Sequence, residues 1–362
     1  MKRIAIIGAA GYVGLELARQ IRNGDYEVNA IVRDNGRFLL RDSGFNFISP
    51  SELGKETDRV DVVVNLAYPT SGPEFQYPSK NLEILNIIDS LMGPDSRLIH
   101  VSTAAVFGFN LERPVVVGPV PCCREYPYIE SKIELENLIL KRFKGQNIQI
   151  VRFGNVWGAG SSAWTASIAN KILFSQPVGV QDIDGYCNAT DVVNAASFLA
   201  CLIEKSDSYG IQFFHLAEFA ECRWSTWIQR IEEVLKQKAF YVPNMPYYPS
   251  SLLQEVWRSV SPVKPLSLWN QFNRGRFSAS WTRTLVRRFG EVRYENFKKK
   301  YKAQQPLPTG YLLELPDELF LTILSTKNKF ETSVPREWKP VLDFEESWSR
   351  VELWMHSAGY TR

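Results

Sequence analysis

The chain is poor in the residues that metal sites and disulfide frameworks require. Its 362 residues include three histidines and five cysteines, and none of these stand at the paired spacings typical of zinc sites. We therefore expect no bound metal. The odd cysteine count, with no secretion signal ahead of a first motif at residue 8, indicates reduced thiols and a cytoplasmic protein.

A long apolar run and a strong charge bias are also missing. No stretch is long enough to cross a bilayer, so we expect no membrane partner. A net charge of +3 favours no particular partner, and we expect no nucleic-acid binding. Hydrophobic residues make up 45% and charged residues 22%, the balance of an ordinary globular protein.

Short apolar runs alternate with helix-like segments along the first 220 residues. This alternation predicts an α/β fold, a Rossmann-type doubly wound parallel sheet. The expected strands are 2–7, 27–32, 60–66, 97–103, 147–152 and 211–216, and the expected helices are 12–22, 79–92, 129–143 and 189–204.

From about residue 222 tryptophans are dispersed and prolines clustered. We therefore predict a dinucleotide-binding domain at 1–221 and a smaller, mostly helical substrate-binding lid at 222–362. Residues 154–190 are expected to leave the sheet and line part of the substrate pocket.

Three glycines connect the first expected strand to the first expected helix, in Gly8-Ala-Ala-Gly11-Tyr-Val-Gly14. Such glycines allow a tight turn, close approach of a pyrophosphate to the backbone, and close packing of helix on strand. The N-terminus of the helix adds free N–H groups and the positive end of its dipole. We predict a dinucleotide site here, formed by Gly8, Gly11, Tyr12, Val13 and Gly14.

Tyr128 and Lys132 stand four residues apart, which places them on one face of a helix. A neighbouring ammonium lowers the pKa of a tyrosine, which is ordinarily about 10, toward the range where acid–base catalysis is efficient. Thr103 ends an apolar run, and its hydroxyl can reach the same substrate oxygen. These three residues are the predicted catalytic group.

The glycine turn, Ser102-Thr103-Ala-Ala-Val-Phe-Gly108 and Tyr128-x-x-x-Lys132, in this order, resemble the extended short-chain dehydrogenase/reductase family, which modifies nucleotide sugars. The resemblance implies that Tyr128 exchanges a proton with the substrate and that Lys132 also holds the nicotinamide ribose. It implies further cofactor contacts at Leu66 and Ala67 in Val64-Asn-Leu-Ala67, at Asn81, and at Phe153. Substrate contacts are implied at Thr103, Ala104 and Asn155.

The preferred cofactor depends on the end of the second expected strand. Arg33 follows its last apolar residue, and a guanidinium there accommodates the 2′-phosphate of NADP. Asp34 can instead reach a ribose hydroxyl, so NAD stays open. NADP is the preferred prediction.

Ala104 and Ala105 occupy the places where dehydratases of the family carry acidic residues, so elimination is not expected. We predict an NADPH-dependent ketoreductase acting on a nucleotide-diphosphate 4-keto-sugar. A nucleotide-sugar epimerase with tightly held NAD, a reductase of a non-nucleotide ketone, and a non-catalytic NADP-binding regulator remain alternatives.

Resemblance also suggests a diphosphate contact at Arg274 and Arg276, which are otherwise surface residues, and a homodimer formed through the helix that carries Tyr128.

Overall fold

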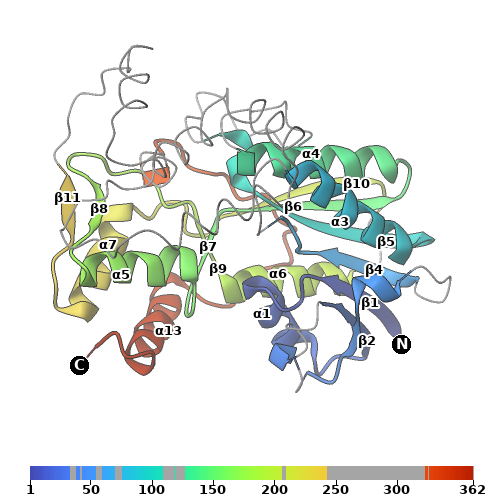
Figure 1. Ribbon diagram of the computed structural model, residues 1–362, viewed down its shortest axis with the longest axis horizontal. Helices are drawn as coiled ribbons and strands as arrows, with labels where there is room; N and C mark the ends of the chain where they lie inside the picture. Colours follow the sequence, from blue (N-terminus) through green and yellow to red (C-terminus); the bar gives the residue numbers. More distant parts are fainter. Residues whose placement is uncertain are drawn as a thin grey trace, which may run out of the picture.

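The computed structural model describes residues 1–32, 38–40, 43–53, 59–69, 76–108, 118, 127–205, 209–242, 323–324 and 326–361. Within these residues a seven-stranded parallel sheet has the order β10-β6-β5-β4-β1-β2-β3 (Figure 1). Its strands are β1 (Lys2–Ile7), β2 (Tyr26–Ile31), β3 (Asn46–Ile48), β4 (Val60–Asn65), β5 (Met92–Thr103), β6 (Asn147–Phe153) and β10 (Ile211–Leu216).

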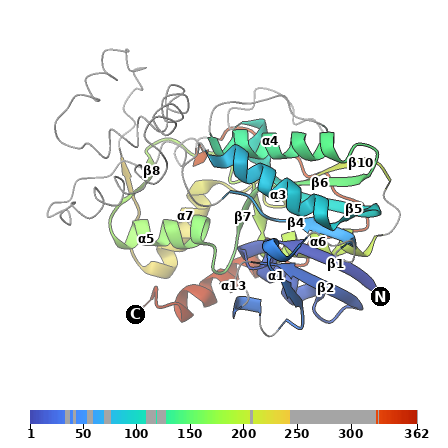
Figure 2. The ribbon, with the colours of Figure 1, turned by 45° about the vertical axis from the view of Figure 1, so that its right-hand side comes forward.

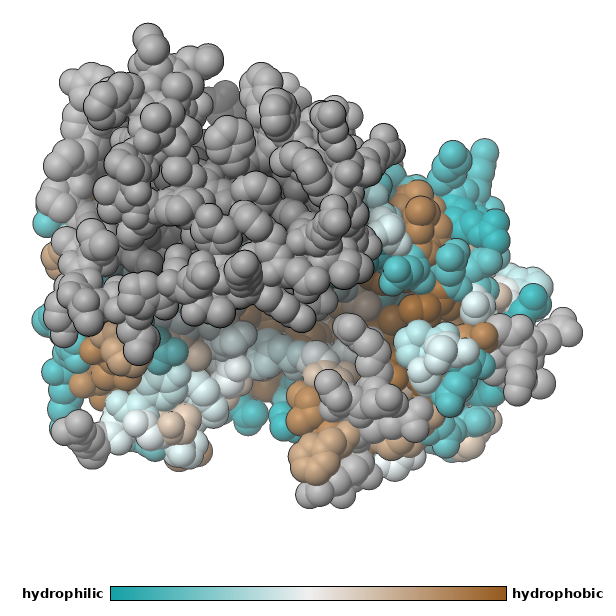
Figure 3. Space-filling view, viewed as in Figure 1, coloured by the Kyte–Doolittle hydropathy of each residue, from teal (hydrophilic) through white to brown (hydrophobic). Residues whose placement is uncertain are grey.

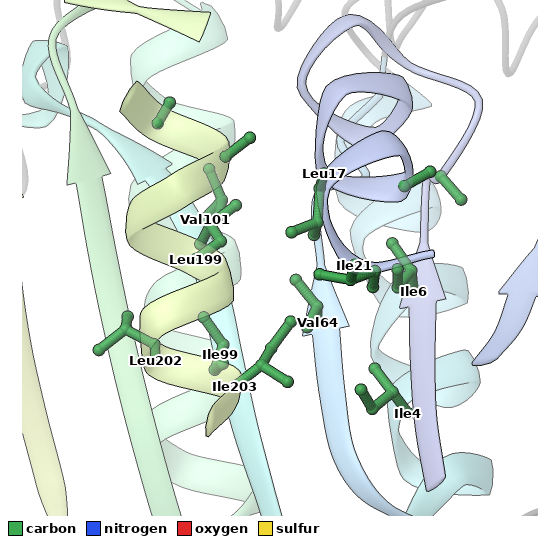
Figure 4. Packing of buried hydrophobic residues seen from close by; sticks show 14 of the residues in the cluster. Ile4, Ile6, Leu17, Ile21, Val64, Ile99, Val101, Leu199, Leu202 and Ile203 are labelled. Atoms are coloured by element: carbon green, nitrogen blue, oxygen red, sulfur yellow. The ribbon is translucent and has the colours of Figure 1, made fainter. Parts of the chain in front are cut away.

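Helices cover both faces of this sheet. Helices α1 (Tyr12–Ile21) and α6 (Val192–Glu204) pack together on one face, while α3 (Tyr77–Leu91) and α4 (Pro127–Arg142) pack together on the other (Figures 1 and 2). Figure 4 shows Leu17 of α1 and Leu199 of α6 turned toward β4 and β5, where Val64 and Ile99 meet them. Apolar residues line both faces of the strands because both faces are buried.

The doubly wound α/β fold is thus confirmed, and the six expected strands and four expected helices are present with ends shifted by a few residues. The seventh strand, β3, was not expected. It is three residues long and pairs only with β2 at the edge of the sheet, and its Asn46 is exposed. A strand this short carries no apolar run by which a sequence pattern can identify it.

A second lobe lies beyond one end of the sheet and has its own core. Trp157 is buried there against Trp227, with ring centroids 3.9 Å apart, and against Trp348, at 6.2 Å. Its elements are β7 (Asn155–Trp157), η6 (Ser162–Ala166), α5 (Ser167–Leu173), β8 (Pro177–Val180), β9 (Ala189–Asp191), α7 (Trp224–Leu235), β11 (Phe240–Val242) and α13 (Phe344–Ser357). Three short helical turns complete the description: η1 (Phe38–Leu40), η2 (Pro50–Glu52) and η5 (Ala104–Phe107).

The chain crosses between the two lobes more than once. Residues 155–180 build part of the second lobe, and the expectation that 154–190 line part of the substrate pocket stays a prediction. Near the C-terminus, Ser333 exchanges two backbone hydrogen bonds with His215 of β10, and Trp338 packs on Phe198 of α6. Residues after 221 therefore also contribute to the core of the first lobe, and the division of the chain at 221 stays a prediction.

In the described part of the chain, no helix combines the length and the apolar character needed to cross a membrane. On the face shown in Figure 3, apolar patches among the described residues are interspersed with hydrophilic ones.

Candidate active site

The glycine turn lies between β1 and α1 and contacts the end of β4. Gly8 has φ +83°, a left-handed conformation that glycine adopts without strain. Its carbonyl accepts a hydrogen bond from the Gly11 N–H at 2.9 Å, which closes the turn. A Cβ added to Gly8 would lie 3.1 Å from the backbone nitrogen of Ala67. The turn and the segment after β4 are therefore in direct contact.

The three glycines differ in what they do. Gly14 is buried, and a Cβ there would lie 2.5 Å from the Gly8 carbonyl oxygen, so a side chain cannot fit between helix and turn. Gly11 is exposed at the N-cap of α1, where the helix presents its free N–H groups. Neither Gly8 nor Gly11 carries a side chain that would cover these N–H groups. The glycine turn forms a cradle that fits a dinucleotide pyrophosphate, which the exposed Gly11 and the amides of the first helical turn would hold.

Tyr12 and Val13 continue this cradle into α1. The Tyr12 hydroxyl donates a hydrogen bond to the Ala159 carbonyl at 3.1 Å, which ties the helix to the second lobe. Val13 and Leu66 pack on the core beneath the cradle. Phe153 is also in that core and only 1% exposed, so its side chain is not available to a cofactor. For Phe153 the predicted contact can involve the backbone alone.

The catalytic group predicted from sequence is brought together at the carboxyl edge of the sheet. Thr103 ends β5, and Tyr128 and Lys132 lie on the first two turns of α4. The Thr103 hydroxyl oxygen accepts from the Ala105 N–H at 3.2 Å, and the Thr103 and Tyr128 side chains are within hydrogen-bonding reach of each other. The role of the Thr103 hydroxyl toward a substrate oxygen stays a prediction.

The environment of Tyr128 differs from the expected one. Burial raises its pKa above the ordinary value, the neighbouring Tyr68 raises it further, and the hydrogen bond with Thr103 opposes both. Tyr128 is accordingly a neutral phenol that holds its proton at neutral pH.

Lys132 is buried, with 5% of its surface exposed. Its Nζ donates to the Val101 carbonyl at 3.4 Å, and burial lowers its pKa to about 8, opposed by the charge of Glu136. An ammonium has three protons to donate, so a single long hydrogen bond leaves capacity for ribose hydroxyls. This fits the predicted role of Lys132 toward a nicotinamide ribose.

Sequence reasoning missed Tyr68, which stands beside both catalytic side chains. Lys132 Nζ lies 4.5 Å from the centre of the Tyr68 ring. The Tyr68 and Tyr128 rings meet edge to face, with centroids 5.5 Å apart. The available signal was its position directly after Ala67, at the carboxyl end of a strand.

A buried charge network beneath the site was missed as well. Arg152 of β6 and Glu136 of α4 form a two-point ion pair, with N–O distances of 2.7 and 3.1 Å. The guanidinium lies over the rings of Phe107 and Phe213, each about 5.0 Å from its carbon. Glu136 is four residues from Lys132 on the same helix, so helical spacing was the signal.

A second buried pair links β5 to the segment after β4. The Asn65 side-chain oxygen accepts from the Ala67 N–H at 3.1 Å, so its amide nitrogen faces His100 Nδ1 at 2.9 Å. Nδ1 is then the acceptor, and the His100 proton is on Nε2. Burial lowers the His100 pKa well below its ordinary value, with Lys132 adding to this effect. A neutral imidazole therefore supports the backbone at Ala67.

The remaining predicted residues fall into three groups. Asn81 donates through its amide to Ser131 and Glu134, at 2.9–3.2 Å, so its described contacts position α4. Asn155 donates to the Cys187 carbonyl at 2.7 Å, and Ala104 lies in the turn after Thr103. The cofactor and substrate contacts of these residues remain predictions. Arg33, Arg274 and Arg276 lie outside the described residues.

In the part of the chain that the structure describes, no group of three or more histidine, cysteine, aspartate or glutamate residues could hold a metal ion.

Comparison with known protein families identifies the family of this chain. A family model described as RmlD substrate binding domain matches residues 1–299. The chain belongs to this family. It is thereby a member of the extended short-chain dehydrogenases/reductases, a family of nicotinamide-dependent enzymes, as the motifs around Gly8, Thr103 and Tyr128 predicted.

The individual relatives are distant. The UDP-glucuronic acid decarboxylase 1 of Danio rerio is 26% identical over 181 residues, which cover 44% of this chain and 42% of that protein. The chain thus matches less than half the length of this relative.

Solved structures share the fold. The Bacillus cereus UDP-glucuronic acid 4-epimerase in complex with NAD superposes with a TM-score of 0.54 at 20% identity, covering 67% of this chain and 86% of that one. The Bifidobacterium longum UDP-glucose 4-epimerase in complex with NAD⁺ and UDP superposes with a TM-score of 0.51 at 17% identity, covering 67% of this chain and 86% of that one.

Proposed function

We propose that this chain is a nicotinamide-dependent oxidoreductase acting at a carbonyl or hydroxyl carbon of a nucleotide-activated sugar. One observation carries the proposal. Thr103, Tyr128 and Lys132 converge at the carboxyl edge of the sheet, where the glycine turn also lies. Ligands of doubly wound sheets bind at this edge. A nicotinamide bound there would supply reversible hydride exchange with the substrate carbon.

We propose a proton path through these contacts. The Ala105 N–H donates to the Thr103 oxygen, and Thr103 and Tyr128 interact through their side chains. In this path Thr103 would hold the Tyr128 phenol, whose proton would pass to the substrate oxygen. Lys132 would hold the ribose and supply the positive charge that stabilises Tyr128 when its proton has been transferred.

Reduction of a 4-keto-sugar with NADPH is our first candidate. Tyr128 holds its proton at neutral pH, which is the form that a carbonyl reduction consumes. Ala104 and Ala105 supply no acid for an elimination. Arg33 suits a 2′-phosphate, and the preference for NADP rests on that residue alone.

Epimerisation with retained NAD is a second candidate of equal standing. The similar structures from Bacillus cereus and Bifidobacterium longum are epimerases in complex with NAD. An epimerase uses the same tyrosine in both directions, oxidising a sugar carbon and then reducing it from the other side. The UDP in the second structure supports a nucleotide-activated substrate.

Small molecules released from the purified protein separate these candidates. Retained NAD at near one equivalent favours the epimerase. A protein without cofactor that binds NADPH at least tenfold more tightly than NADH, about 1.4 kcal/mol, favours the ketoreductase. A panel of nucleotide-diphosphate 4-keto-sugars, with non-nucleotide ketones beside them, then tests turnover by NADPH absorbance.

A Tyr128→Phe variant separates an enzyme from a cofactor-binding regulator. We expect turnover to fall by at least a hundredfold, as for loss of a general acid, while cofactor affinity stays within about twofold. Unchanged turnover in this variant would refute the assignment of Tyr128. The molecular mass of the wild-type protein in solution, measured by analytical ultracentrifugation, tests the predicted homodimer.

A further inference from the structure

The residues on either side of Tyr68 fix the course of the backbone there. The preceding Ala67 donates its N–H to buried Asn65 and touches the glycine turn at Gly8. The following Pro69 is buried, and a proline restricts the residue before it to extended backbone. These contacts hold the backbone on either side of Tyr68, and 39% of the residue is exposed.

The ring of Tyr68 is in contact with both members of the predicted catalytic pair. Its face is turned to the Lys132 ammonium, 4.5 Å from the ring centre. Tyr128 meets it at an interplanar angle of 77° with centroids 5.5 Å apart. Cation–π attraction and edge-to-face packing both have their preferred geometry at such distances.

The other described partners of the Lys132 ammonium do not satisfy it fully. The Val101 carbonyl accepts at 3.4 Å, a long hydrogen bond. Glu136 attracts the charge but has both carboxylate oxygens bonded to Arg152. A buried ammonium is costly without close partners, so the face of an aromatic ring contributes to holding it.

We propose that Tyr68 is a positioning residue of the active site, whose ring holds the Lys132 ammonium in place for the nicotinamide ribose. The proposal rests on the proposed function, because it assigns a role toward the nicotinamide cofactor. The ring carries the effect and the hydroxyl does not, since both contacts are made by the aromatic face and edge. A phenylalanine at position 68 should therefore keep this positioning role, and a leucine there should lose it.

The affinity for dinucleotides tests this without any substrate. Wild type, Tyr68→Phe and Tyr68→Leu are titrated with NADH, NADPH and ADP by calorimetry. For the dinucleotide that binds wild type more tightly, we expect Tyr68→Leu to bind about tenfold more weakly and Tyr68→Phe within twofold. ADP lacks the nicotinamide ribose and should bind all three proteins equally. Tyr209→Leu, at a tyrosine that is 82% exposed, is the matched control.

A pH series adds a readout that a merely structural role would not move. Among the described residues, the charged or titratable side chains that interact with Lys132 are Glu136, His100 and Tyr68, and Tyr128 stands one helical turn before it. Burial keeps His100 neutral near pH 8, so a loss of affinity there reports the Lys132 proton. We expect wild type and Tyr68→Phe to lose dinucleotide affinity as the pH rises through about 8. Tyr68→Leu should lose dinucleotide affinity at a pH about half a unit lower than wild type does.

Equal dinucleotide affinity and equal pH dependence in Tyr68→Leu and wild type would overturn the proposal while leaving the proposed function intact. Equal loss of ADP affinity in Tyr68→Leu would also overturn it, because the change would then reach the whole site. A wild-type protein that binds neither NADH nor NADPH would remove the proposed function and this inference with it.

Discussion

Replacing Glu136 with leucine leaves the Arg152 guanidinium buried without its carboxylate. Both side chains are almost fully buried, at 0% and 4% exposure, and they bond at two points. Removing one partner of such a pair costs about 3–5 kcal/mol, because the remaining charge is left buried without its counter-ion. The rings of Phe107 and Phe213 hold the guanidinium from its faces but cannot replace the carboxylate.

Removing both charges should largely reverse this loss. Arg152→Met places a flexible apolar side chain between the same two rings. Buried ion pairs replaced by apolar residues of similar volume are often neutral in stability. We expect the double variant of Glu136→Leu and Arg152→Met to unfold within about 1 kcal/mol of wild type. This comparison forms a double-mutant cycle, whose coupling energy isolates the pair.

Unfolding in guanidinium chloride, followed by tryptophan fluorescence, measures these differences in the free energy of unfolding, since the chain has ten tryptophans. A single Glu136→Leu variant within about 1 kcal/mol of wild type would refute the argument, because the buried guanidinium would then have found another partner. A double variant as unstable as the sum of its two single variants would refute the coupling. A Glu136→Gln variant, which keeps one acceptor, should fall between wild type and leucine.

Three further predictions concern other parts of the molecule. Gly14→Ala should weaken NADH binding by more than about tenfold, because its Cβ would lie 2.5 Å from the Gly8 carbonyl oxygen; unchanged affinity by calorimetry would contradict this. Burial raises the pKa of Glu218 from 4.5 to about 7, so its neutral form stabilises the fold below pH 4.5. That contribution, on the order of 3 kcal/mol, should be lost as the pH rises to about 7, and Glu218→Gln should flatten the pH dependence of unfolding. A hydrogen bond from the Cys187 thiol lowers the pKa of Cys222, while burial raises that of Cys187. Alkylation at neutral pH, followed by peptide mass spectrometry, should therefore find Cys222 modified before Cys187. Equal labelling of these two cysteines would contradict this.

Much of the fold could be predicted from sequence because its signals are local. An apolar run of six residues that leads into glycines 8, 11 and 14 is a strand, a turn and a helix in direct succession, and neighbouring residues suffice to specify it. The same holds for Tyr128 and Lys132, whose helical spacing alone places them side by side. The edge strand β3 was missed because pairing with β2 defines it, and no local pattern does.

By itself, then, the sequence determined the element order, the glycine turn, and the residue types that the chemistry needs. Tertiary structure decided how those residues are surrounded. It buried Lys132, brought the Thr103 hydroxyl to Tyr128, and placed the Tyr68 ring beside the Lys132 ammonium. The physical reason is that pKa values and hydrogen-bond directions depend on burial and on neighbours from other strands. Residues 60 positions apart in the chain become neighbours only when the parallel strands align their carboxyl ends.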